Sequence, residues 1–288
     1  MSESVVREPV LSEPVAPGAK LPGPVQQSLL RRRDAGGKAL VPFVTAGITP
    51  DWTDYVRACA EQGADAIEIG LPFSDPMLDG PVIQAASGQA LARGARTADL
   101  LDELAALELG PAGVPLIVMT YSNIVRRRGD EAFCHALAAA GIRGLIVPDT
   151  PLDEIEPLLG ASRAAGIELI LLVAPSTKPH RVSRIAELSS GFVYAVSTMG
   201  VTGVRDAVSD TVQRTVEGIR QHTDLPVLVG FGISSPAQAV QASRRADGVV
   251  VASALMRDVL AGASASDLAA TVSSFRTELD GTDWSQAR

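Results

Sequence analysis

The chain has 288 residues, of which 46% are hydrophobic and 20% charged, values that fit a globular α/β protein with a sizeable core. Its formal net charge of −8 and its aromatic content of only 4% exclude a general nucleic-acid-binding protein and argue against docking on acidic membranes. An anionic small molecule would therefore need a local binding site.

The cysteine pattern and the hydropathy of the chain indicate the cellular compartment of the protein. The two cysteines, Cys59 and Cys134, each lie in an alanine-rich helical pattern without metal-ligand spacing, so we expect reduced packing residues and no metal. No apolar run reaches the roughly 18 residues needed to span a membrane, and the N-terminus lacks the apolar core of a secretory signal. We expect a cytoplasmic protein.

The two ends of the chain differ from its centre. Residues 1–24 carry five prolines among polar residues and no hydrophobic period, which predicts a disordered tail. A helix is predicted over Val25–Arg33, ahead of Gly36 and Gly37. We expect a single domain over residues 25–279 and a short C-terminal tail over 280–288.

Between these ends, short apolar runs alternate with amphipathic stretches. Strands are predicted at Ala39–Thr45, Ala66–Gly70, Pro115–Thr120, Gly144–Pro148, Glu168–Val173, Phe192–Val196, Val227–Gly230 and Gly248–Val251. Helices are predicted at Trp52–Gln62, Pro81–Arg93, Thr97–Leu107, Asp130–Ala140, Leu152–Ala165, Pro179–Leu188, Asp210–Gln221, Pro236–Arg245 and Ser266–Leu279.

Eight strands that alternate with helices favour a parallel sheet of the α/β class closed into a (β/α)8 TIM barrel, with an additional helix before it. The alternative is an open doubly wound sheet, which normally carries a GxGxxG turn after its first strand. Here that strand leads into Thr45-Ala46-Gly47-Ile48 instead, which favours the barrel.

The stretch from Asp65 to Pro81, DAIEIGLPFSDPMLDGP, combines a buried strand with acidic residues. Side chains alternate along a strand, so Glu68 shares one face with an alanine and a glycine, while two isoleucines take the other face. Asp75 and Asp79 follow in a proline- and glycine-rich loop. A buried strand glutamate is costly unless it is satisfied or used, and from this stretch alone the structural and the functional readings are equally favoured.

In a (β/α)8 barrel the active site lies where the strands end, and several polar or aromatic residues fall there. They are Phe43, Glu68, Tyr121, Asn123, Asp149 and Tyr194. Glycine- and serine-rich turns follow strands six, seven and eight: 197–203, 230–236 and 251–254. Such turns, with helix N-termini beside them, predict a phosphate site, although capping serines in tight turns would explain each one singly.

The remaining ionisable residues narrow the chemistry. His135, His180 and His222 all fall in or beside predicted helices, and no lysine lies in a predicted strand. Carboxyl groups and a phenol are therefore left to move protons, with Glu68 and Asp79 ahead of Tyr194.

These segments resemble the tryptophan synthase α subunit family over about residues 24–262. The motifs that carry the resemblance are PFVTAG at 42–47, EIGLPFSDP at 68–76 with DGP at 79–81, GVTG at 200–203 and GFGIS at 230–234. The glutamate-to-Asp79 segment is specific to that family, whereas the glycine-rich turns occur in many phosphate-binding barrels. Ala252 departs from the family, in which glycine is common at that position.

The resemblance implies a carbon–carbon lyase of tryptophan biosynthesis that cleaves indole-3-glycerol phosphate to indole and glyceraldehyde 3-phosphate. It implies Glu68 as general acid and base, Asp79 as the carboxylate on the indole nitrogen, and Tyr194 as a hydrogen-bonding neighbour of the glutamate. The substrate-binding residues that it implies are Phe43, Tyr121, Thr202, Gly203, Gly232 and Ser253.

The family works with a β subunit that carries pyridoxal phosphate (PLP), so the resemblance implies that partner, an αββα heterotetramer and no cofactor in this chain. Asp75 and Asn123 would face the partner. Two alternatives stay open: another phosphate-binding barrel enzyme, and a ligand-binding subunit that activates its partner with little activity of its own.

Overall fold

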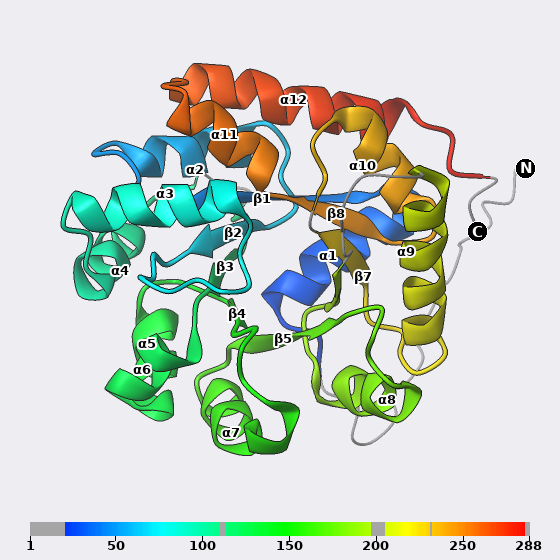
Figure 1. Ribbon diagram of the computed structural model, residues 1–288, viewed down its shortest axis with the longest axis horizontal. Helices are drawn as coiled ribbons and strands as arrows, with labels where there is room; N and C mark the ends of the chain where they lie inside the picture. Colours follow the sequence, from blue (N-terminus) through cyan, green and yellow to red (C-terminus); the bar gives the residue numbers. More distant parts are fainter. Residues whose placement is uncertain (1–20, 110–112, 197–204, 231, 286–288) are drawn as a thin grey trace, which may run out of the picture.

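The computed structural model describes residues 21–109, 113–196, 205–230 and 232–285, with the backbone alone over 205–210. Eight parallel strands in this part of the chain close into a barrel in sequence order, which confirms the predicted (β/α)8 fold (Figure 1). The strands are β1 Ala39–Thr45, β2 Ile67–Gly70, β3 Leu116–Met119, β4 Gly144–Ile146, β5 Glu168–Val173, β6 Val193–Val196, β7 Val227–Gly230 and β8 Gly248–Val251.

Helices surround the barrel as an outer layer (Figure 1). They are α2 Trp52–Glu61, α3 Pro81–Ala92, α4 Thr97–Ala105, α5 Ser122–Arg128, α6 Asp130–Ala139, α7 Glu156–Ala164, α8 Pro179–Leu188, α9 Arg205–Arg220, α10 Pro236–Ser243, α11 Ser253–Leu260 and α12 Ala265–Gly281. Among the residues described, none of the helices has the length and apolar character that crossing a membrane requires.

Five helical segments differ from the prediction. The short helices α5 and α11 were not predicted, and α9 begins at Arg205, five residues early. The predicted helix Leu152–Ala165 is divided into a 3-10 turn, Leu152–Glu154, and α7, because Pro157 fits the first turn of a helix but not its interior. Helix α12 continues to Gly281, and the Lys38 Nζ atom lies over the Trp284 ring, 5.0 Å from its centroid. Part of the predicted C-terminal tail is therefore packed on the barrel. Residues 1–20, the body of the predicted N-terminal tail, lie outside the described residues.

Helix α1, Pro24–Asp34, crosses the middle of the ring of strands (Figure 1), close to the helix predicted at Val25–Arg33. Its first N–H groups donate to Glu168, the first residue of β5: Val25 N–H to Oε2 at 2.7 Å and Gln26 N–H to Oε1 at 3.0 Å. A carboxylate at a helix N-terminus satisfies donors that the helix itself cannot. Helix α1 therefore covers the N-terminal end of the barrel and leaves the C-terminal end for a site.

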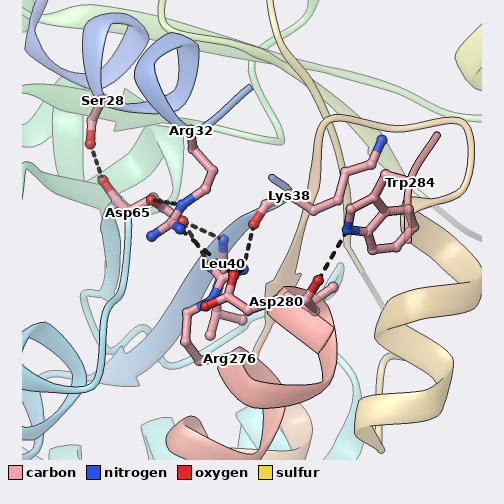
Figure 2. A network of polar contacts seen from close by, with 9 residues as sticks. Ser28, Arg32, Lys38, Leu40, Asp65, Arg276, Asp280 and Trp284 are labelled. Atoms are coloured by element: carbon pink, nitrogen blue, oxygen red, sulfur yellow. Dashed lines mark hydrogen bonds and ion pairs between the residues drawn. The ribbon is translucent and has the colours of Figure 1, made fainter. Parts of the chain in front are cut away.

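Asp65, just before β2, joins α1, β1 and α12 at the same end (Figure 2). Its carboxylate accepts from Arg32 Nε at 2.8 Å, from Leu40 N–H at 2.9 Å and from a terminal nitrogen of Arg276 at 3.2 Å. Asp247, just before β8, repeats the pattern with Arg220 and with Val227 N–H. In both cases one aspartate ties the start of its own strand to the start of a neighbouring strand.

We predict that Asp65→Ala lowers the free energy of unfolding by about 3 kcal/mol, because the nearly buried Arg276 loses a charge partner and Leu40 N–H loses its acceptor. The measurement is urea unfolding followed by circular dichroism. The matched control is Asp54→Ala, which removes an exposed ion pair with Arg57 and should cost less than about 1 kcal/mol. Equal losses in the two variants would contradict this role for Asp65.

Candidate active site

Glu68 lies in the middle of β2 and is 1% exposed. Its backbone pairs with Phe43 on one side and with Ile117 on the other. Residues in register share a face, and the next residue on that face, Gly70, has no side chain. A Cβ at Gly70 would overlap the ring of Phe43, so the glycine provides the space in which that ring lies. Glu68 is thereby held on the inner face of the barrel beside an aromatic ring.

Burial raises the pKa of Glu68 to about 8, and the negative charge of Asp79 contributes in the same direction. Its Oε2 atom is buried and has no hydrogen-bond partner among the described residues. By contrast, the two buried carboxylates that join elements of the fold, Glu168 and Asp65, each accept several hydrogen bonds. A protonated carboxyl group with one buried oxygen left unbonded is suited to proton transfer.

Asp79 lies in the loop after β2 and is half-buried. Burial raises its pKa to about 6, while a hydrogen bond from the Tyr121 hydroxyl, 3.1 Å from Oδ2, acts to lower it. That hydroxyl also accepts Leu78 N–H at 3.2 Å, and the Tyr121 ring stacks on Phe73 with centroids 5.0 Å apart. The two carboxyl groups thus titrate on opposite sides of neutrality, which is the pattern of an acid paired with a base.

Tyr194, in β6, is 3% exposed, and burial together with the charges of Glu68 and Asp79 holds its pKa well above the usual value. A Cβ at Gly230 of β7 would overlap the Tyr194 hydroxyl, so this glycine allows the ring its place. The structure therefore brings Glu68, Asp79 and Tyr194 close enough to affect one another's ionisation, with Phe43 and Tyr121 beside them.

The predicted phosphate turns are only partly described. Ser253 is the first residue of α11, whose first-turn N–H groups have no partner within the helix, and Gly232 has a φ of +77°. Ser235 instead caps α10 by accepting Gln238 N–H, and Ser234 donates both its N–H and its hydroxyl to Gln238 Oε1 at 2.8 Å. Both serines before α10 are thus bonded to Gln238 of that helix. Thr202 and Gly203 lie outside the described residues.

The two residues predicted to face a partner are both on the surface. Asp75 is exposed and accepts the Ser74 hydroxyl at 2.6 Å, and Asn123 is exposed on α5. Between Asp75 and Asp79 the loop exposes two large apolar side chains, Met77 at 80% and Leu78 at 46%. Neither residue was predicted to have a role, although adjacent apolar residues in an acidic loop are a visible signal in the sequence.

A closed parallel barrel with a protonated glutamate on its inner face, and a second carboxyl group at the end where the strands finish, defines a (β/α)8-barrel enzyme built for acid–base chemistry. The family model described as tryptophan synthase alpha chain matches residues 29–281. The chain belongs to the tryptophan synthase alpha chain family.

Individual relatives agree with this assignment. The chain is 47% identical over 229 residues to the tryptophan synthase alpha chain of Microcystis aeruginosa, covering 78% of this chain and 86% of the relative. It is 44% identical over 253 residues to that of Prochlorococcus marinus, covering 86% and 91%. Among solved structures, tryptophan synthase from Mycobacterium tuberculosis superposes with a TM-score of 0.82 at 38% identity, covering 90% of this chain and 99% of the other. Tryptophan synthase subunit alpha from Legionella pneumophila superposes with a TM-score of 0.82 at 30% identity, with the same coverage.

Proposed function

We propose that the chain is a carbon–carbon lyase that cleaves indole-3-glycerol phosphate to indole and D-glyceraldehyde 3-phosphate. The observation that carries the proposal is the pair of carboxyl groups with separated pKa values, about 8 for Glu68 and about 6 for Asp79. Near pH 7 the first is mainly protonated and the second mainly ionised. One can donate a proton while the other accepts one.

In the proposed reaction, protonated Glu68 donates its proton to indole C3, and the Asp79 carboxylate accepts the indole N–H and stabilises the positive charge on the ring. The Glu68 carboxylate then takes the proton of the hydroxyl on the glycerol carbon attached to C3. As that carbonyl forms, the electrons of the carbon–carbon bond return to the indole ring, and indole leaves. Glu68 ends as it began, protonated, so the step needs no oxidant, reductant or metal.

The other predicted residues bind the two ends of the substrate. We assign Phe43 and Tyr121 to the walls around the indole, because both rings are buried beside the carboxyl groups. The backbone N–H groups at Gly232 and Ser253 are assigned to the phosphate, with Thr202 and Gly203 as further predicted contacts. A helix N-terminus favours an anion through both its free donors and its dipole.

The test of the function is a product assay with the purified chain and indole-3-glycerol phosphate. Indole is measured by its absorbance and glyceraldehyde 3-phosphate by a coupled dehydrogenase, and equal amounts of the two are expected. Substrate loss without indole, or no turnover with or without a β subunit, would contradict the proposal.

We predict a bell-shaped pH dependence of kcat/KM, with limbs near pH 6 and pH 8. Activity should rise as Asp79 ionises and fall as Glu68 loses its proton, because the reaction needs the first charged and the second neutral. The two limbs belong to a coupled pair of carboxyl groups, and burial together with the charges of this pair raises the pKa values of Tyr121 and Tyr194. The substrate phosphate also titrates near pH 6, so Asp79→Asn is the control that separates the acid limbs. A profile flat from pH 5 to 9 would exclude this assignment.

We propose a PLP-dependent β subunit as the partner and an αββα assembly of the two. The support is the exposed loop of Asp75, Met77 and Leu78, together with Asn123 on α5, since adjacent exposed apolar side chains rimmed by polar residues mark protein interfaces. PLP is assigned to the partner and no cofactor to this chain, and the cytoplasm stays our prediction for its location. Co-purification with a PLP protein, followed by sedimentation analysis of the complex, tests the assembly.

A further inference from the structure

Asp149 lies in the turn after β4 and is half-buried. Both oxygens of its carboxylate are used on a single residue, Ser122, the first of helix α5: Oδ1 accepts the Ser122 N–H at 2.8 Å and Oδ2 accepts the Ser122 hydroxyl at 2.7 Å. Asp149 thus clamps the beginning of α5 from the turn that follows the neighbouring strand β4. A seven-residue helix is too short to hold its own geometry, so such an external clamp decides where it begins.

The residue before Ser122 is Tyr121, which is 4% exposed and precedes the first turn of α5. Its hydroxyl donates to Asp79 Oδ2 at 3.1 Å and accepts Leu78 N–H at 3.2 Å. Fixing Ser122 therefore fixes the backbone from which the Tyr121 ring extends, and with it the place of the hydroxyl that orients Asp79. The contacts form one continuous path from Asp149 through Ser122 and Tyr121 to Asp79.

We infer that Asp149 is a positioning residue for the cleavage reaction, acting through Ser122 and Tyr121 on the orientation of the Asp79 carboxylate. The inference rests on the proposed function. Asp149 does not touch the reacting atoms; it holds the helix start that lets Tyr121 present its hydroxyl to Asp79. A displacement of about 1 Å in a group that orients a reacting carboxyl lowers the rate by up to about 100-fold.

The test is a double-mutant cycle on kcat and KM with Asp149→Ala and Tyr121→Phe. Each single variant should lower kcat by about 10- to 100-fold with a smaller change in KM, and the double variant should be no slower than Tyr121→Phe alone. The ionisable groups around Asp79 are Glu68, Tyr121 and Tyr194. The acid limb of the pH profile should move to higher pH in all three variants, because Asp79 loses the hydrogen bond that lowers its pKa. Losses that multiply, with an unmoved acid limb, would overturn the inference.

Matched variants separate positioning from general stability. Asp267 likewise accepts both the N–H and the hydroxyl of Ser264, at the exposed start of α12, so Asp267→Ala should lower the melting temperature and leave the pH profile unchanged. Should Asp149→Ala fail to fold, Ser122→Ala serves in its place, since it removes the hydroxyl contact and keeps the N–H contact; full activity in it would refute the clamp. A wild-type chain without cleavage activity refutes the proposed function, whereas an active wild type with an unaffected Asp149→Ala refutes this inference alone.

Discussion

Replacing Glu68 with glutamine should lower kcat/KM for indole-3-glycerol phosphate by at least about 1,000-fold, because one side chain carries out both proton transfers and an amide can do neither. The measurement is the rate of indole release at pH 7 with and without the β subunit. Glutamine has nearly the same size and removes no hydrogen bond to Oε2, which has no partner among the described residues. The barrel should therefore keep its fold.

The same substitution should stabilise the protein. Measuring the stability of the variant therefore serves as a control for its loss of activity. The pKa of Glu68 is about 8 in the folded state and near its ordinary value of 4.5 in the unfolded state, so the folded state binds more protons between these values. The wild type therefore loses stability as pH rises from about 4.5 to about 8, and Glu68→Gln should not. At pH 8 the variant should be more stable by an amount on the order of a few kcal/mol. A less stable and fully active variant would contradict both parts.

Replacing Asp79 with asparagine should lower kcat by about 100-fold, because the amide accepts the indole N–H without the negative charge that balances the ring cation. The measurement is steady-state cleavage between pH 5 and 9. The acid limb near pH 6 should lose the contribution of Asp79 and keep that of the substrate phosphate.

The control for this variant is Asp54→Asn, at an exposed carboxylate on α2 that pairs with Arg57 on the surface. It should leave kcat and the pH profile unchanged. An Asp79→Asn enzyme that matched this control would remove Asp79 from the reaction, and Glu68 would then have to work alone.

The strands were predictable because each is a short run that is largely buried and largely apolar, and a parallel sheet covered on both faces produces such runs. Helix α5 was not predictable in the same way. Its sequence, SNIVRRR, is short and has no amphipathic period, and its beginning depends on Asp149, 27 residues away. Local patterns do not report a helix that a distant side chain holds in place.

The features of the site also differ in whether a local sequence pattern predicts them. Glu68 could be assigned to the inner face because strand side chains alternate. The contact between Tyr121 and Asp79 joins two loops, and loop conformation follows from packing that a sequence pattern does not encode. Likewise, the sequence could not show that Ser234 and Ser235 both bond to Gln238, because that contact depends on how the turn packs against α10.

The most direct test of the account is a carbon-13 NMR titration of the glutamate carboxyl groups in the wild type, with Glu68→Gln used to identify the Glu68 signal. We predict that this signal titrates near pH 8 and that it is absent from the variant. A Glu68 signal that titrates near 4.5, the ordinary value for glutamate, would show an ionised carboxylate at neutral pH. Such a group has no proton to give to indole C3, and the proposed mechanism would be wrong.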